Sequence, residues 1–147
     1  MIACMSIDIG GVYRVDFPNR GGGELYGPHY AVVLSDIDPG DHTLLVAPIT
    51  SKKPGRKYRG GITLNTHKYQ HHPRYDKCFV YIRKIQEVDS KRLTFDKVPR
   101  LSSDGQPLYD RNGRNLFYKK YTKIYQLDDT DLALLRNKIK QVIPFDW

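Results

Sequence analysis

The stretch that decides the fold is residues 27–51, GPHYAVVLSDIDPGDHTLLVAPITS. It holds two short apolar runs, at 31–34 and 44–47, each bounded by proline, glycine or aspartate. Continuous apolar runs of this length are typical of strands that are buried on both faces. Between them, residues 36–41 contain Pro39-Gly40 and predict a short turn. We therefore predict an antiparallel pair that forms the inner strands of a sheet.

The ends of these two predicted strands carry polar side chains. His29 precedes the first run, and Thr50 and Ser51 follow the second. An antiparallel pair with a short connection brings the start of one strand beside the end of the other. We expect His29 and Thr50 to share one rim of the sheet. On pattern alone, both residues also have a purely structural explanation: His29 as a hydrogen-bonded histidine at a strand end, and Thr50 as a threonine that favours β-structure.

Composition bounds the class of protein. A chain of 147 residues fits one domain, residues 1–147, with its own core. No apolar run approaches the roughly 20 residues of a membrane span, and the first residues predict no signal peptide, so we expect a cytoplasmic protein without a membrane partner. Two cysteines, Cys4 and Cys78, are too few for a disulfide scaffold. The net charge of +8 predicts an anionic partner, either nucleic acid or an acidic protein.

Other segments extend the sheet and add one helix. Residues 11–17 alternate apolar and polar side chains, which predicts a half-buried strand, and three glycines at 21–23 predict a mobile loop. Residues 78–89 are rich in β-branched and aromatic side chains and predict one long strand, with Phe79, Tyr81 and Arg83 on the same face. Residues 128–143 have capping side chains followed by apolar positions at helical spacing. Pattern alone thus predicts an α+β fold: a strongly curved antiparallel sheet with a C-terminal helix.

Two segments carry concentrated charge. Residues 51–61, SKKPGRKYRGG, contain five cations and no carboxylate. They are either a solvated loop or a track for the phosphates of RNA, with a tyrosine that could stack on a base. The second segment, residues 96–123, contains Asp-Gly and Asn-Gly turns and the run FYKKY. We interpret it as a surface hairpin and predict that it is an insertion. The predicted RNA-binding residues are Ser51, Lys52, Lys53, Arg56, Lys57 and Tyr58.

A group of potential metal ligands lies between the predicted strands. It consists of His67, His71, His72, Asp76 and Cys78. A proline interrupts the run, and the spacing matches no closed zinc signature. We therefore predict neither a metal site nor a cofactor.

The order of these parts resembles the PemK/MazF (Kid-type) toxins of bacterial toxin-antitoxin systems. The resemblance is carried by Gly-Val-Tyr-x-Val-Asp at 11–16, Ala-Val-Val-Leu at 31–34, Val-Ala-Pro-Ile-Thr-Ser at 46–51, Gln-Glu-Val-Asp at 86–89 and the final amphipathic helix. It implies a small barrel-like sheet, as also found in CcdB-type toxins, and a homodimer. It further implies a metal-independent, sequence-specific endoribonuclease that cleaves single-stranded RNA and is held in check by an acidic antitoxin.

The resemblance also implies roles for particular residues. Thr50 matches the family's phosphate-holding hydroxyl, and His29 occupies the position of the family's catalytic arginine. Arg83 falls on the third site position. The chemistry of RNA cleavage, rather than the resemblance, adds Glu24, in the loop that reaches the same rim, as a second candidate proton carrier, with Asp76 as a weaker one. Metal-free RNA cleavage needs a base for the ribose 2′-OH, an acid for the leaving 5′-oxygen and donors around the phosphorane. A histidine suits either proton-transfer role near neutral pH.

Two other functions are compatible with the same sequence. One is a non-catalytic module that binds only nucleic acid, including DNA, or antitoxin. The other is a CcdB-like gyrase inhibitor. Intact RNA with broken DNA after induction would distinguish the gyrase inhibitor, and absence of growth arrest would distinguish the inert module.

Overall fold

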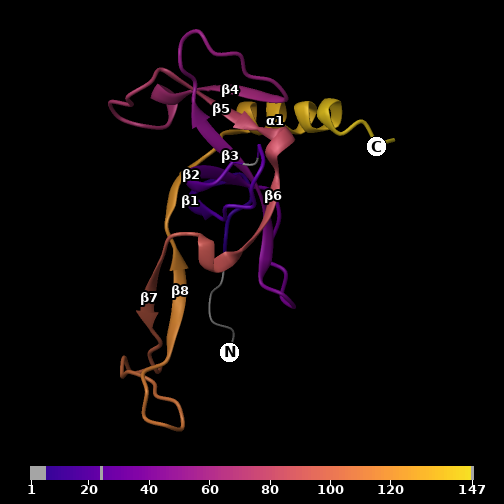
Figure 1. Ribbon diagram of the computed structural model, residues 1–147. Coiled ribbons are helices and arrows are strands. Elements are labelled where there is room, and N and C mark those ends of the chain that lie inside the picture. The colour runs from indigo at the N-terminus through magenta and orange to yellow at the C-terminus, as the bar shows by residue number, and fades with distance from the viewer. Residues whose placement is uncertain (1–5, 24, 147) are drawn as a thin grey trace.

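The computed structural model describes residues 6–23 and 25–146, and Figure 1 shows their arrangement. A seven-stranded sheet forms the body, a two-stranded ribbon projects from one end of it, and one α-helix packs against the opposite end. The strands are β1 (Gly11–Phe17), β2 (Gly27–Val33), β3 (Thr43–Ser51), β4 (Gly61–Asn65), β5 (Lys77–Tyr81), β6 (Gln86–Asp89), β7 (Phe95–Pro99), β8 (Phe117–Tyr121) and β9 (Lys123–Gln126). The helix is α1 (Asp129–Val142), and three single 3₁₀ turns are η1 (Thr66–Lys68), η2 (Ile82–Lys84) and η3 (Ser90–Arg92).

The body is an antiparallel sheet with the order β4-β5-β3-β2-β1-β9, and β6 pairs with β3 outside this path. The predicted inner strands, β2 and β3, occupy the middle of this order. The path starts at β4 and ends at β9, so the sheet is curved and barrel-like but open. This confirms the predicted α+β class with an antiparallel sheet and a C-terminal helix.

The long strand β3 bends the sheet because its two halves have different partners. Its first half pairs with β6, from Thr43↔Asp89 to Val46↔Gln86, and its last residues pair with β5, from Ile49↔Val80 to Ser51↔Cys78. Between β5 and β6 the chain forms η2. The sheet therefore splits at this point.

This break corrects the prediction of one continuous strand at 78–89. The carbonyl of Gly60 accepts the amides of Ile82 and Arg83, at 2.9 and 3.1 Å, and Ile82 is buried in the core. These contacts turn the chain after Tyr81. Arg83 consequently leaves the row of Phe79 and lies exposed.

Apolar side chains fill both sides of the sheet. Along β1, Val12 belongs to one cluster with Leu135 of α1, whereas Tyr13, Val15 and Phe17 belong to a second cluster on the opposite side. The half-buried alternation predicted for 11–17 is thereby confirmed. In the two predicted inner runs, Leu34 is partly buried and Leu45 in β3 is 43% exposed, whereas the other six residues are buried: Ala31, Val32, Val33, Leu44, Val46 and Ala47.

Strands β7 and β8 form a separate antiparallel ribbon, here called the arm, which points away from the body in Figure 1. Its register runs from Phe95↔Tyr121 to Pro99↔Phe117. Beyond the strands, tight turns close at Gly105 and Gly113, both with positive φ. The predicted surface hairpin is confirmed; its status as an insertion stays a prediction.

The helix α1 begins at the predicted cap, where the side chain of Asp128 accepts the amide of Asp131 at 2.9 Å. No helix in residues 6–23 and 25–146 has the length and apolar character of a membrane span.

Candidate functional site

His29 and Thr50, which are distant in the sequence, lie at the same end of the sheet. The pairing of β2 with β3 includes Tyr30↔Ile49, and His29 and Thr50 are the next residues of the two strands in that register. Directly opposed residues of an antiparallel pair project their side chains to the same face. Both residues line one cavity of about 520 Å³, here called the His29 cavity.

The imidazole of His29 is partly buried and has one identified partner. Its Nε2 lies 3.1 Å from the carbonyl oxygen of Tyr26, and its ring centroid lies 6.2 Å from that of Phe17. A carbonyl can only accept, so Nε2 carries the proton and Nδ1 of the neutral ring keeps its lone pair. Burial lowers the pKa of His29 below its ordinary value, partly offset by the bond to Tyr26. The neutral form is therefore favoured near pH 7.

Thr50 stands at the border between two cavities. Thr50, Ser51 and Lys53 line the His29 cavity and also a second cavity of about 370 Å³. The second cavity, here called the Tyr58 cavity, is also lined by Arg56, Lys57, Tyr58 and Tyr81. A group bound at Thr50 would thus have an adjacent space on either side, one of them strongly cationic.

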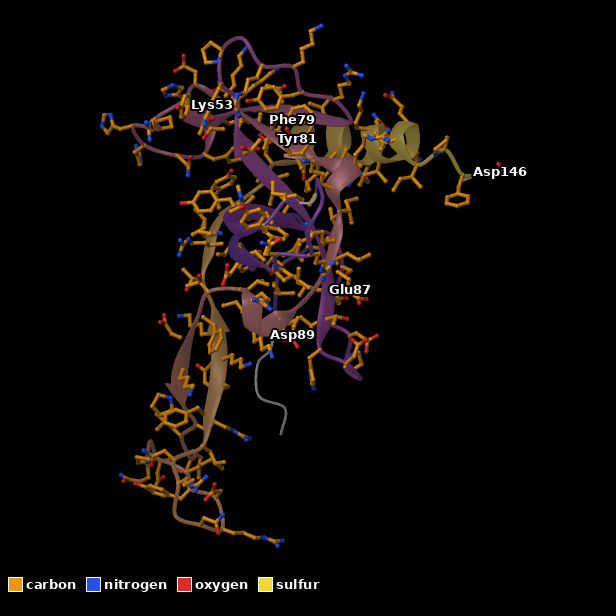
Figure 2. The ribbon with its side chains drawn as sticks, in the orientation of Figure 1. Lys53, Phe79, Tyr81, Glu87, Asp89 and Asp146 are labelled. Carbon is orange, nitrogen blue, oxygen red and sulfur yellow. The ribbon has the colours of Figure 1, made fainter. Side chains whose placement is uncertain are left out.

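The basic loop after β3 is held in place by Tyr58. The Tyr58 hydroxyl accepts the amide of Lys53 at 2.8 Å and donates to the Ser51 carbonyl at 3.2 Å. Its ring packs on Phe79 and Tyr81, with centroid distances of 5.3 and 6.2 Å. Figure 2 shows Lys53, Phe79 and Tyr81 at the same end of the body. Tyr58 therefore anchors the cationic loop beside Thr50.

The structure does not bring all the predicted residues to this site. Lys52 lines neither of these cavities, because its Nζ donates to Thr63 Oγ1 at 2.9 Å. Arg83 also lines neither, since its side chain lies over Gly60, where a Cβ would be 2.2 Å from its Cγ and Cδ. The exposed carboxylate of Asp76 pairs with His67 at 2.8 Å. Glu24 lies outside the described residues.

Several residues that sequence reasoning missed line the His29 cavity. They are Arg14 on β1, Gln70 and Arg74 in the segment 66–76, and Tyr125 on β9. Arg14 lies on the polar side of the β1 alternation and pairs with Tyr30, and this neighbour was the available signal. The segment 66–76 has no periodic pattern in the sequence, so its position over the strand ends could not be predicted.

A polar cluster, here called the η1–α1 cluster, holds this segment against the helix. The buried carboxylate of Asp131 accepts the hydroxyl of Tyr69 and the Nζ of Lys68, the latter at 3.2 Å. Lys68 also pairs with Asp128 at 2.5 Å. The ring of Tyr69 stacks on Tyr125 at 4.8 Å, and burial together with Asp131 raises the pKa of Tyr69. One wall of the His29 cavity is therefore attached to α1.

The remaining polar groups near the cavity do not form a metal cluster. Within residues 6–23 and 25–146, no three His, Cys, Asp or Glu side chains gather so as to hold a metal ion. Cys78 lines the cavity, but burial raises the pKa of its thiol, which stays protonated and weakly nucleophilic.

The fold has a known structural counterpart. The crystal structure of MazF (Form-I) from Deinococcus radiodurans superposes with a TM-score of 0.57 over 95% of this chain and 97% of that chain. The sequences are 18% identical, so this similarity shows a shared fold. Comparison with curated protein sequences finds no match.

A family model gives the corresponding result for the sequence. The model of the PemK-like, MazF-like toxin of type II toxin-antitoxin systems matches residues 8–106, which include β1 to β7 and every residue that lines the two cavities except Tyr125. The matched segment is about two thirds of the 147 residues. The chain therefore belongs to the PemK/MazF family of toxins of type II toxin-antitoxin systems.

Proposed function

We propose that this toxin is an endoribonuclease that cleaves single-stranded RNA by attack of a ribose 2′-OH, leaving a 2′,3′-cyclic phosphate and a 5′-OH. The observation that carries the proposal is the presence of His29 and Thr50 in one cavity, together with Ser51 and Lys53. Imidazole, hydroxyl and ammonium groups are the parts that this reaction needs when side chains alone move the protons. Membership of the toxin family supports the same activity.

His29 is the base in this proposal. Its Nε2–H is engaged by Tyr26, and its Nδ1 takes the proton from the 2′-OH. The 2′-oxygen attacks phosphorus, and the bond from phosphorus to the 5′-oxygen breaks. The lowered pKa of His29 favours this role over that of an acid, because a base must be unprotonated before the reaction.

The scissile phosphate binds at the border between the two cavities. The Thr50 hydroxyl and Lys53 donate to its non-bridging oxygens. Arg14 and Arg74, which also line the His29 cavity, are further candidate cations for the phosphate. Preorganised donors around the developing charge are usually the largest single contribution to catalysis. Arg14 and Arg74 replace Arg83 in our assignment because they line the His29 cavity. Glu24 remains the candidate acid for the 5′-oxygen.

The Tyr58 cavity accommodates the nucleotide next to the scissile phosphate. Arg56 and Lys57 line it and face the backbone phosphates, while Tyr58 and Tyr81 offer aromatic surface to the base. Cationic grooves with aromatic walls are the usual means of binding single strands.

Two protein partners accompany this function. We expect an acidic antitoxin, which complements the net charge of +8, and a homodimer. Analytical ultracentrifugation of the purified toxin tests the dimer, and co-purification with the product of a neighbouring reading frame tests the antitoxin.

The end groups of the products test the activity. Mixed-sequence single-stranded RNA is incubated with purified toxin and EDTA, and the fragments are offered to polynucleotide kinase and to phosphatase. We expect fragments whose 5′ ends accept phosphate directly and whose 3′ ends resist phosphatase until acid opens the ring. Intact RNA would instead favour a non-catalytic binding module, and 5′-phosphate ends would exclude attack by the 2′-OH.

A further inference from the structure

The arm has one face that differs in charge from the other. In the register of β7 with β8, Lys97 is directly opposite Lys119, and the second pair outward, the next one on the same face, is Pro99↔Phe117. Opposed residues and their second neighbours share a face, so these side chains and the pair Phe95↔Tyr121 emerge together. We call this set the arm face: Phe95, Lys97, Pro99, Phe117, Lys119 and Tyr121.

The two lysines of the arm face are not neutralised. Like charges directly opposite each other on a sheet destabilise it. In the described part of the chain no ion pair involves Lys97 or Lys119, and the Nζ of Lys119 lies over the ring of Phe95 at 4.8 Å. On the reverse face the corresponding pair is Asp96↔Lys120, with opposite charges. An anion between the two lysines would remove the repulsion.

Exposed aromatic surface lies beside these cations. Phe117 is 45% exposed, although it is a large apolar side chain. It lines a hollow of about 370 Å³ together with Lys119, His42 and Lys91 of η3. That hollow contains one carboxylate, Asp89, against the two lysines. The cationic and aromatic surface therefore continues from the arm onto the body.

The same character extends toward the tip of the arm. Tyr109 is 58% exposed, and Arg111 and Arg114 are exposed beside it. Residues 95–121 contain six Lys and Arg against three Asp, a net charge of +3. Figures 1 and 2 place this surface far from the proposed cleavage site: Lys53 lies at one end of the body, and Asp89 lies toward the arm.

We infer that the arm face is a second binding surface for single-stranded RNA, which holds the chain outside the cleavage site. A phosphate lies between Lys97 and Lys119, and an unpaired base stacks on Phe117. An exposed ring favours a single strand over a duplex, whose bases are already stacked. The alternation of cations with rings favours RNA over an acidic peptide. The inference rests on the proposed function only in naming RNA as the ligand.

The test is a binding measurement that needs no cleavage. A 2′-O-methyl RNA of about 30 nucleotides lacks the attacking hydroxyl and exceeds the roughly 4–16 nucleotides that one single-strand module covers. Fluorescence anisotropy over a series of salt concentrations compares wild type with Lys97→Gln/Lys119→Gln. For the variant we expect weaker binding and a slope of log Kd against log salt that is smaller by about 1.4, roughly 0.7 for each lost charge. Phe117→Ala should weaken binding about tenfold at unchanged slope.

The single variant Lys119→Gln is measured in the same way, and its matched control is Lys120→Gln, which removes one charge from the neighbouring position on the reverse face. The control should retain wild-type affinity, while circular dichroism verifies that all variants fold. Equal losses from Lys119→Gln and Lys120→Gln would overturn the inference, because they would show only the effect of net charge. Tighter binding of duplex DNA of equal length, or loss of polyglutamate binding with RNA binding unchanged, would also overturn it. If the wild type binds this RNA through the arm but cleaves no natural RNA, the proposed enzymatic function fails and the inference stands.

Discussion

The two ends of the molecule place cations and aromatic rings near each other in different ways. Around Thr50, each strand is hydrogen-bonded to neighbours on both sides, and the side chains stand on a core that is filled on both faces. The arm has only two strands and a single cation–ring contact, from Lys119 to Phe95, on its charged face. Positions of reacting groups must be held closely, whereas a surface that only retains RNA tolerates more movement. This difference supports the proposal that RNA is cleaved at the end that contains Thr50 and is only bound at the arm.

The largest expected effect on the cleavage site is that of His29→Ala. Loss of the proposed base should lower the rate of RNA cleavage by about 10²–10⁴ without changing the melting temperature. Gel assays of initial rates measure the effect. His71→Ala, which removes an exposed histidine that does not line the cavity, is the control and should cleave at the wild-type rate. Cleavage by His29→Ala at the wild-type rate would assign the base elsewhere.

Truncation of one apolar side chain in the body and one in the arm compares how much packing in each region contributes to the free energy of unfolding. Leu64 is buried in the body, so Leu64→Ala should lower the free energy of unfolding by about 2–4 kcal/mol. Val98 in the arm is only partly buried, and Val98→Ala should cost less than about 1 kcal/mol. Urea denaturation followed by circular dichroism gives both values. Similar losses would show that the arm is as tightly packed as the body.

The pH dependence of cleavage sharpens the role of the His29 cavity. Burial lowers the pKa of His29 from 6.5, so the neutral base should predominate above that pH. Cleavage (kcat/KM) should be constant near neutral pH and fall about tenfold per pH unit below the lowered pKa. The residual activity of His29→Ala should not show this fall in kcat/KM at acidic pH. An activity that rises on acidification through the same range would instead make His29 the acid.

The smallest effect concerns the arm alone. Lys97→Gln/Lys119→Gln removes a like-charged pair and should raise the free energy of unfolding by about 0.2–1 kcal/mol at low salt. Lys120→Gln removes the oppositely charged residue that lies across from Asp96, and it should lower the free energy of unfolding by a similar amount. Paired denaturation curves at low and high salt measure both changes. The two effects should converge at high salt, since exposed charges are screened.

Much of the fold follows from local patterns. The alternation at 11–17, the two apolar runs and the capped helix predict β1, β2, β3 and α1, because each pattern matches the period of its own structure. The break at η2 does not follow, because it depends on hydrogen bonds to Gly60, a residue on another strand connection. The exposure of Leu45 does not follow from the sequence either, because its apolar neighbours Leu44 and Val46 are buried and the run gives no sign of the difference.

The candidate site divides in the same way. The neighbourhood of His29 and Thr50 follows from antiparallel pairing, which fixes the strand ends relative to each other. Gln70 and Arg74 were not predicted, because they reach the cavity through contacts between segments far apart in the sequence. Arg14 was missed although it lies on β1 opposite Tyr30 of β2. Arg83 illustrates the opposite error: an assumed continuous strand gave it an orientation that η2 changes.

The η1–α1 cluster has a consequence for how this toxin is made. Tyr69 depends on Asp131, a residue 62 positions later, to fix the segment that covers the His29 cavity. During translation, the nascent chain therefore contains His29, Thr50 and Gln70 long before α1 emerges from the ribosome to hold that segment. Under the proposed endoribonuclease activity, a ribosome-bound intermediate should therefore be harmless to its own messenger, and cleavage should begin only when synthesis has passed the helix.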